Sequence, residues 1–177
     1  MADPVHLERL RGGVEGWNDW RSGVVLKEVD LRGADLREMD LRGVDLWYAK
    51  LQGARLDGTL LVGAVLDRAD LTLADLSRAN LFGARLRGCV LEQAVLRSTV
   101  LAQADLTLAR LGEAELDATV FTGATVMGAN LHATDLDGAL GLEPDTGWVQ
   151  EAPALRAVAS TEGTASLHGG LRHTSGA

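Results

Sequence analysis

A leucine recurs at every fifth position over most of the chain, and this period constrains the fold more than any other feature. The column runs from Leu26 to Leu136 as 23 consecutive units without an insertion, with Phe121 and Val126 as its two substitutions. The residue two places before each centre is small or modest in size, most often alanine. Any fold for this chain must therefore keep two apolar positions inside once every five residues.

Neither regular secondary structure satisfies that requirement. In an α-helix, five residues of about 100° each rotate the leucine column by about 140° per unit and spread it around the helix. In one long β-strand, side chains alternate, so successive leucines five residues apart would point to opposite faces. A bend once per unit keeps both apolar positions inside, and repeated bends in one sense close the chain into a coil.

The units "ADLTL", "ADLSR", "ANLFG" and "ARLRG", residues 69–88, resemble the A-(D/N)-L-x-x signature of the pentapeptide-repeat family. The resemblance covers residues 24 to about 140. It implies an all-β fold, a right-handed quadrilateral parallel β-helix with one unit per side and four units per coil. The central residue and the residue two before it would point inward. At the sheet spacing of ~4.8 Å, nearly six coils would form a rod roughly 28 Å long.

The repeat predicts three parts of the chain: an N-terminal helical cap at 1–23, the β-helix at 24–140, and a C-terminal capping segment at 141–177. Open solenoid ends need covering because each coil contacts only its neighbours. Residues 160–177 are small and polar and are expected to be disordered. The apolar residues expected to dock the C-terminal segment on the last coil or on a partner are Trp148, Val149, Leu155 and Val158.

The N-terminal segment has the signals of a helix start. Asp3 can serve as N-cap with Pro4 at the first helical position. Glycines at 12, 13 and 16 weaken the helix, which is therefore expected to depend on docking against the first coil. An amphipathic membrane or partner helix is the alternative, and the acidic residues and scarce lysines argue against the membrane version. The expected apolar stripe consists of Leu7, Leu10, Val14 and Trp17.

The sequence predicts no catalytic, cofactor-binding or metal-binding residues, and the chain is interpreted as not being an enzyme. Cys89, the single cysteine, takes an inward small-residue position, where a buried thiol is not activated. A formal net charge of −8 disfavours direct binding of nucleic acid. The N-terminus lacks a signal-peptide pattern, and no apolar run approaches the ~20 residues of a membrane helix. A cytoplasmic location is expected. The histidines, which do not cluster in a structured region, are His6, His132, His168 and His173.

Since every unit has the same interior, specificity must lie in the outward residues. Sorting the units four to a coil gives one side that carries no charge after Arg42. Such an uncharged surface indicates a homodimer interface or a site for another partner protein. It could instead be covered by the C-terminal segment, or flat β surfaces could merely tolerate these side chains. We call this surface the apolar strip: Leu60, Val62, Phe82, Val100, Ala102 and Val120.

The adjacent side ends in an acidic cluster, defined as Glu115, Asp117, Asp135 and Asp137. Acidic residues are expected to face solvent singly, and the side with Arg85 and Arg87 to be locally basic. Residues 24–140 hold 17 acidic and 12 basic residues, a net of −5.

Some family members protect DNA gyrase and topoisomerase from inhibitors, and are thought to do so by mimicking duplex DNA. The resemblance thus implies a type II topoisomerase, DNA gyrase or topoisomerase IV, as a candidate partner. Duplex DNA would carry roughly 16 negative charges over the length of this rod. The net charge of −5 over residues 24–140 therefore reproduces the charge of DNA poorly. A general protein-interaction scaffold, docking an unrelated partner or itself, is the alternative.

Overall fold

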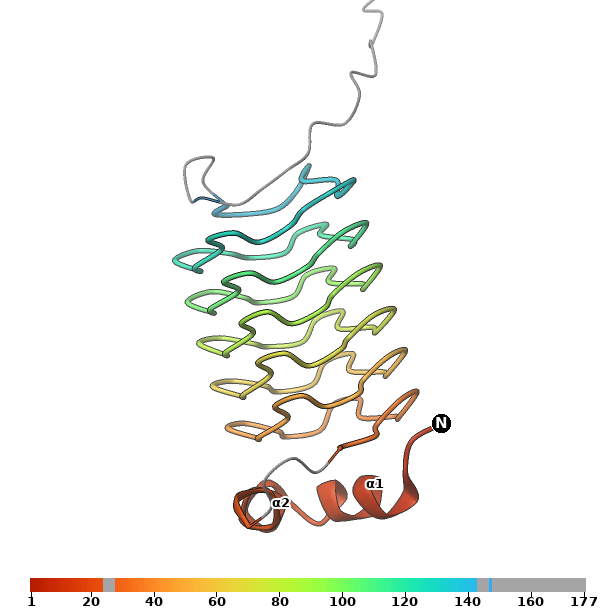
Figure 1. Ribbon diagram of the computed structural model, residues 1–177. Coiled ribbons are helices and arrows are strands. Elements are labelled where there is room, and N and C mark those ends of the chain that lie inside the picture. Colours follow the sequence, from red (N-terminus) through yellow and green to blue (C-terminus); the bar gives the residue numbers. More distant parts are fainter. Residues whose placement is uncertain (24–27, 143–146, 148–177) are drawn as a thin grey trace, which may run out of the picture.

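The computed structural model describes residues 1–23, 28–142 and 147, and places two helices ahead of a stack of coils (Figure 1). The helices are α1, Pro4–Arg11, and α2, Val14–Ser22. Within the described residues the coils are joined by isolated parallel β-bridges, each linking a residue to the one 20 positions later. These bridges run from Asp30↔Lys50 to Val120↔Leu140, so four five-residue units complete one coil.

Each unit contains one tight turn that begins at its central leucine. The amide of Ala34 donates to the carbonyl of Leu31 at 3.0 Å, and Gly33 between them has a φ of 65°. A positive φ at the third turn residue is the signature of a type II turn. The same left-handed conformation recurs where the unit ends in a larger residue, for example Leu73 with a φ of 59°. The bend required by the five-residue period is therefore the same in each such unit, whichever residue ends it.

The aspartate or asparagine of the A-(D/N)-L motif supports this turn from outside. The Oδ1 atom of Asp70 accepts a hydrogen bond from the amide of Thr72 at 3.0 Å, and Asn80 holds Phe82 in the same way at 3.0 Å. Short polar side chains favour such local bonds to the backbone two residues later. The motif thus stabilises the turn and leaves the coil-to-coil backbone bonds, such as Leu71 to Val90 at 2.7 Å, unaffected.

The interior of the coils is built from the central leucines and the small residues before them. Leu71 and Ala74 are representative, with none of their surface exposed. Where threonine replaces alanine, its hydroxyl finds a backbone acceptor: Thr59 donates to the carbonyl of Leu36 at 2.9 Å. A buried hydroxyl without such a partner would be costly, so this bond explains why threonine is accepted inside.

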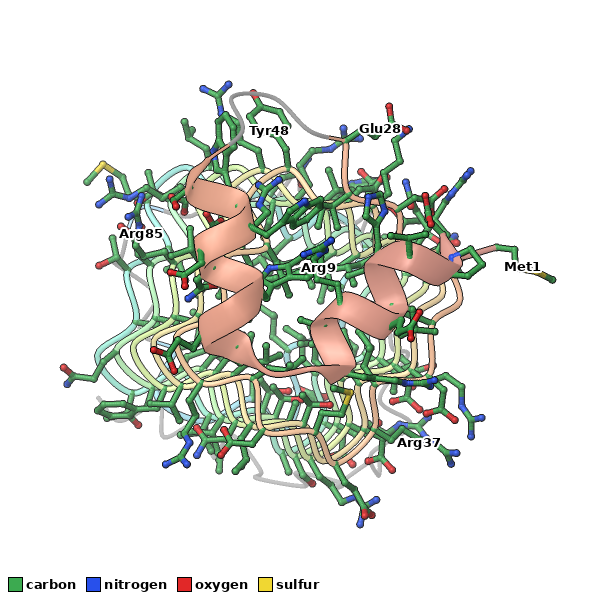
Figure 2. The ribbon with its side chains drawn as sticks, turned by 90° about the horizontal axis from the view of Figure 1, so that it is seen from below. Met1, Arg9, Glu28, Arg37, Tyr48 and Arg85 are labelled. Atoms are coloured by element: carbon green, nitrogen blue, oxygen red, sulfur yellow. The ribbon has the colours of Figure 1, made fainter. Side chains whose placement is uncertain are left out.

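The N-terminal helices lie across the first end of the stack (Figure 2). Asp3 is the N-cap of α1, as expected, with its Oδ1 accepting from the amide of Val5 at 2.8 Å. The sequence pattern suggested one helix, but the chain turns between two, because Gly13 adopts a φ of 114°. Of the expected stripe, Leu10 and Trp17 are buried, whereas Leu7 and Val14 pack half-buried against the core.

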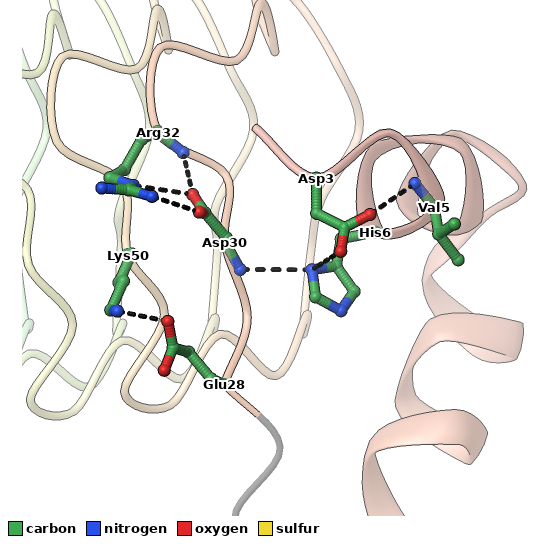
Figure 3. Close-up of polar contacts among 7 residues, drawn as sticks. All are labelled: Asp3, Val5, His6, Glu28, Asp30, Arg32 and Lys50. Atoms are coloured by element: carbon green, nitrogen blue, oxygen red, sulfur yellow. Dashed lines mark hydrogen bonds and ion pairs between the residues drawn. The ribbon is translucent and has the colours of Figure 1, made fainter. Parts of the chain in front are cut away.

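Polar side chains of both helices bond to free backbone groups of the first coil. Trp17 Nε1 donates to the carbonyl of Asp45 at 2.7 Å, and Asn18 Oδ1 accepts from the Asp45 amide at 2.9 Å. In Figure 3, His6 Nδ1 accepts from the amide of Asp30 at 3.2 Å. In later coils the equivalent backbone groups bond to the preceding coil, as the amide of Val65 does to the carbonyl of Val44, and in the first coil side chains of the helices make such bonds.

The prediction for residues 160–177 and for the docking residues Trp148, Val149, Leu155 and Val158 lies outside the described residues. In the part of the chain that the structure describes, no helix is both long enough and apolar enough to cross a membrane.

Candidate protein-binding surface

The structure brings the six residues of the apolar strip together on one side of the rod. Bridges connect Leu60 to Asn80, Asn80 to Val100 and Val100 to Val120, so these residues stack in a column along the rod. Leu60 is 39% exposed and Phe82 is 47% exposed. The remaining four strip residues are half-buried by their neighbours in the adjacent coils. The strip is therefore a largely apolar surface, interrupted by Asn80, with two prominent side chains.

Leu140 extends the strip by one coil and was missed in the sequence. It pairs with Val120 through a parallel bridge and is 52% exposed. Its signal was present, because residue 140 precedes the next expected centre by one position, but glycine at 141 ends the recognisable repeat. With Leu140 the strip reaches the last described coil.

One long edge of the strip is low over two of its units. Gly63 and Gly83 end these units in left-handed turns, and a side chain placed there would meet nothing within 4 Å. Because no side chain rises at these two corners, a partner can approach the strip closely there, whereas Gln103 ends the next unit and lies against Gly123. A flat surface with a low edge suits a broad protein partner better than a small ligand, which needs a concave site.

The acidic cluster lies on the neighbouring side, at the end of the rod remote from the helices. Glu115 forms an ion pair with Arg97 at 2.7 Å. For Asp117, Asp135 and Asp137, the structure as described shows no ion pair. An open depression here is lined by Arg97, Glu113, Ala114, Glu115, Leu116, Asp117, Ala133, Asp135 and Asp137. This end of the side is therefore strongly anionic.

The expectation that acidic residues face solvent singly was wrong for the first coil. Arg37 holds Asp35 with two bonds, Nε to Oδ1 at 2.8 Å and Nη2 to Oδ2 at 2.7 Å. Equivalent pairs join Arg32 to Asp30 and Arg42 to Asp40. The Arg37 hydrogen bond lowers the pKa of Asp35 to about 2, and Arg32 likewise holds the pKa of Asp30 well below its usual range. Arginines thus compensate the charge of these three aspartates.

The expected basic side also differs in the structure. Arg85 pairs with Asp67, whose side chain is largely buried, and Arg87 pairs with Asp105. Each partner stands about one coil away in the stack, at a separation of 18 residues in sequence. Their positive charge is therefore compensated, and the two arginines do not form a free basic surface.

Two exposed aromatic residues lie near the helices, away from the strip. Trp47 and Tyr48 stack edge to face with ring centroids 4.4 Å apart, and Arg68 lies over the Tyr48 ring. Large apolar side chains also project from the corners at Leu108 and Met127. These residues are scattered singly or in pairs, which is normal for protein surfaces, so the strip remains the more specific candidate.

The two described histidines, His6 and His132, lie at opposite ends of the stack of coils, and the cysteine is buried. Cys89 is fully buried, and that burial raises the pKa of its thiol well above the usual range. His6 accepts the amide of Asp30, and His132 is exposed; the sequence prediction for His168 and His173 lies outside the described residues. Among the described side chains, no group of three or more histidine, cysteine, aspartate or glutamate residues could hold a metal ion.

The coils and the exposed side chains of this structure define a repeat solenoid, a class whose fold comes from inside and whose specificity comes from outside. The chain matches the family described as pentapeptide repeats over residues 22–58, 49–88, 74–112 and 104–140. It belongs to the pentapeptide repeat family. That membership implies the right-handed quadrilateral β-helix, and proteins of this family are generally structural or protein-binding rather than enzymes.

Several solved structures are similar to this chain. HetL of Nostoc sp. strain PCC 7120, a protein involved in heterocyst differentiation regulation, is 28% identical over 69% of this chain and 67% of that chain, with a TM-score of 0.36. A pentapeptide repeat protein from the Arabidopsis thaliana thylakoid lumen is 30% identical over 66% and 70%, with a TM-score of 0.30. QnrB1, a plasmid-mediated fluoroquinolone resistance protein, is 20% identical over 57% and 64%, with a TM-score of 0.37. No curated protein matches the sequence.

Proposed function

We propose that this chain is a non-enzymatic, protein-binding rod that contacts its partner through the apolar strip. The observation that carries the proposal is the exposure of Leu60, Phe82 and Leu140 on one side that has no charge beyond Arg42. Leaving such a surface in water is unfavourable, at about 25 cal/mol for each Å² of apolar area. Covering it with a partner recovers that free energy, so the strip favours association.

A more specific proposal is that the partner is a type II topoisomerase, DNA gyrase or topoisomerase IV, which the rod protects from inhibitors. An antibiotic-resistance or self-immunity role would follow. The net charge of −8 and the unpaired carboxylates of the acidic cluster support this partner, because a topoisomerase binds polyanionic DNA. The ion pairs of the first coil restrict the mimicry of DNA to the last coils, so it would be partial.

A supercoiling assay with purified gyrase and a quinolone tests this partner. We expect the full chain to preserve supercoiling in the presence of the inhibitor, or to inhibit it when the rod is in excess. The variant Asp117→Asn/Asp137→Asn should lose this effect. The control Glu38→Gln/Asp75→Asn removes the same charge from the first three coils of the same side, and should behave like the parent. No effect of the parent at any concentration would remove the topoisomerase from consideration.

The second candidate function is a general scaffold that docks an unrelated protein or itself through the strip. The exposed ring of Phe82 and the absence of charge around it favour this function, since neither feature resembles DNA. Replacing Phe82 and Val100 by lysine should change assembly without changing the fold, because both side chains point away from the core. If the double variant keeps the assembly state of the parent, the strip is not the binding surface.

A further inference from the structure

We propose that the occupant of the apolar strip is the same strip of a second copy, packed antiparallel across a twofold axis perpendicular to the rod. This inference rests on the proposed function of the strip as a protein-binding surface, and it assigns the partner. In this arrangement Phe82 lies opposite Ala102 of the second copy, and Leu60 lies opposite Val120 of the second copy.

The spacing of the strip residues favours a second copy over other partners. Their column follows the parallel bridges, so its side chains repeat at the sheet spacing of ~4.8 Å. Turns of a helix repeat at about 5.4 Å and same-face residues of an extended strand at about 6.7 Å, so both fall out of step along the strip. Another copy has the same spacing and stays in register from end to end.

Side-chain size favours the antiparallel arrangement. A twofold axis between the levels of Phe82 and Ala102 sets the largest side chain of the strip against its smallest, and this match repeats on both sides of the axis. A parallel arrangement would instead set Phe82 against Asn80 of the second copy. Asn80 is larger than Ala102, so the parallel arrangement loses the match of the largest side chain with the smallest.

Charge favours the same arrangement. The antiparallel rotation brings the end of one rod that carries Asp135 and Asp137, which have no ion pair in the described chain, to the level of the first coil of the other rod. In that coil Arg37 and Arg42 are paired with Asp35 and Asp40, so the carboxylates of one rod meet paired charges there. A parallel arrangement would instead bring the acidic ends of both rods to the same level, and like charges at the rim of an interface oppose binding. The two ends of the rod thus differ in the sense that an antiparallel pair requires.

The available area sets the expected strength. One side is five residues wide, at most ~17 Å, and nearly six coils or ~28 Å long, which gives on the order of 500 Å² per copy and 1,000 Å² in total. Specific interfaces begin at about this size, and those at the lower end are weak or transient. We therefore expect a reversible, concentration-dependent dimer.

Sedimentation of the full chain over the micromolar range tests the proposal. The mass should rise from the 18.7 kDa of one chain towards twice that value. Phe82→Lys should stay monomeric, whereas Leu108→Lys, placed on another side at a residue that is 66% exposed, should dimerise like the parent. A parent that remains monomeric throughout, or a Phe82→Lys variant that still dimerises, overturns the proposal.

Cysteine cross-linking tests the orientation. Copies carrying Leu60→Cys, mixed with copies carrying Val120→Cys, should form a disulfide-linked pair, and native Cys89 is too buried to interfere. A preferred link between Leu60→Cys and Val62→Cys would show a parallel pair and overturn the arrangement. A parent that dimerises but does not protect gyrase would contradict only the proposal of a topoisomerase partner. A parent that protects gyrase but does not dimerise would contradict only the proposal of a dimer. A monomeric parent in which Phe82→Lys speeds hydrogen exchange at 148–158 would assign the strip to the C-terminal segment instead.

Discussion

The first coil and the last described coils have the same interior and opposite exteriors. Leu31 and Leu131 are both buried in the same way, yet the first coil pairs each aspartate of its Asp-Leu-Arg units with an arginine, whereas Asp135 and Asp137 have no such partner in the described chain. The first coil also has its free backbone groups bonded by the helices. The comparison teaches that the inward residues determine the fold, whereas the outward residues differ from end to end: they pair these aspartates with arginines at one end and, within the described chain, leave Asp135 and Asp137 without such partners at the other.

The largest effect is expected from a substitution that breaks the contact between the helices and the first coil. Trp17→Ala removes a fully buried indole and its bond to the Asp45 carbonyl, and should lower the free energy of unfolding by about 3–5 kcal/mol. Chemical denaturation measures this loss, and hydrogen exchange should show it first at 31–50. Trp47→Ala, a more exposed indole, is the matched control. Equal losses in both variants would mean that the helices do not hold the first coil.

A smaller effect is expected from substitutions at the same turn position at the two ends of the rod. Gly33, with a φ of 65°, and Ala133, with a φ of 53°, both end a unit on one side of the rod. Gly33→Ala should destabilise by about 1–2 kcal/mol, because an L side chain is strained in the left-handed region. Ala133→Gly relieves that strain but adds chain entropy to the unfolded state, so it should change stability by less than about 1 kcal/mol. Thermal unfolding of the two variants measures both; the same sign and size in both would contradict a common left-handed turn.

The smallest expected effect is a difference in acid stability between the two ends of the rod. Asp30 and Asp35 have a folded pKa lowered by their arginines, that of Asp35 to about 2, so the stability they contribute is present above the unfolded value of about 4. It is lost as the pH falls from about 4 to about 2. In the described chain Asp135 and Asp137 have no such arginine partner, so this loss has no counterpart there.

Hydrogen exchange across this range should therefore lose protection at 31–50 before 111–136. Arg37→Gln should reduce the acid sensitivity of the first coil by removing one pair. Earlier loss of protection in the last coils would contradict the assignment of the ion pairs.

The five-residue period was sufficient to predict a coil with the leucine and the alanine inside, because only a bend in every unit keeps both there. The four units per coil followed from the resemblance to the pentapeptide-repeat family, and the bridges between residues 20 positions apart agree with it. The charges could not be predicted in the same way. Arg85 reaches Asp67 and Arg87 reaches Asp105, each about one coil away, and nothing in the local pattern indicates which side chains meet. The break at Gly13 was also missed, because the apolar spacing of Leu10, Val14 and Trp17 continues through it.

The candidate surface was predicted more completely than its surroundings. Sorting the units by side assigned all six strip residues to the one side on which the structure places them, since no insertion disturbs the register. Leu140 was missed at the end of the repeat, where the centre becomes glycine. The sequence predicts the geometry of the strip but not its partner, because a partner is recognised by exposed side chains that follow no period.

The central claim is that the inside of the rod folds and the strip binds, and one paired measurement tests it most directly. Phe82→Lys/Val100→Lys and the parent should unfold at the same temperature, within a few degrees, while only the parent associates in sedimentation. Both side chains point away from the core, so folding should be unaffected. Unchanged association in the double variant would contradict the claim that the strip is the binding surface, and a large loss of stability would contradict the separation of folding from binding.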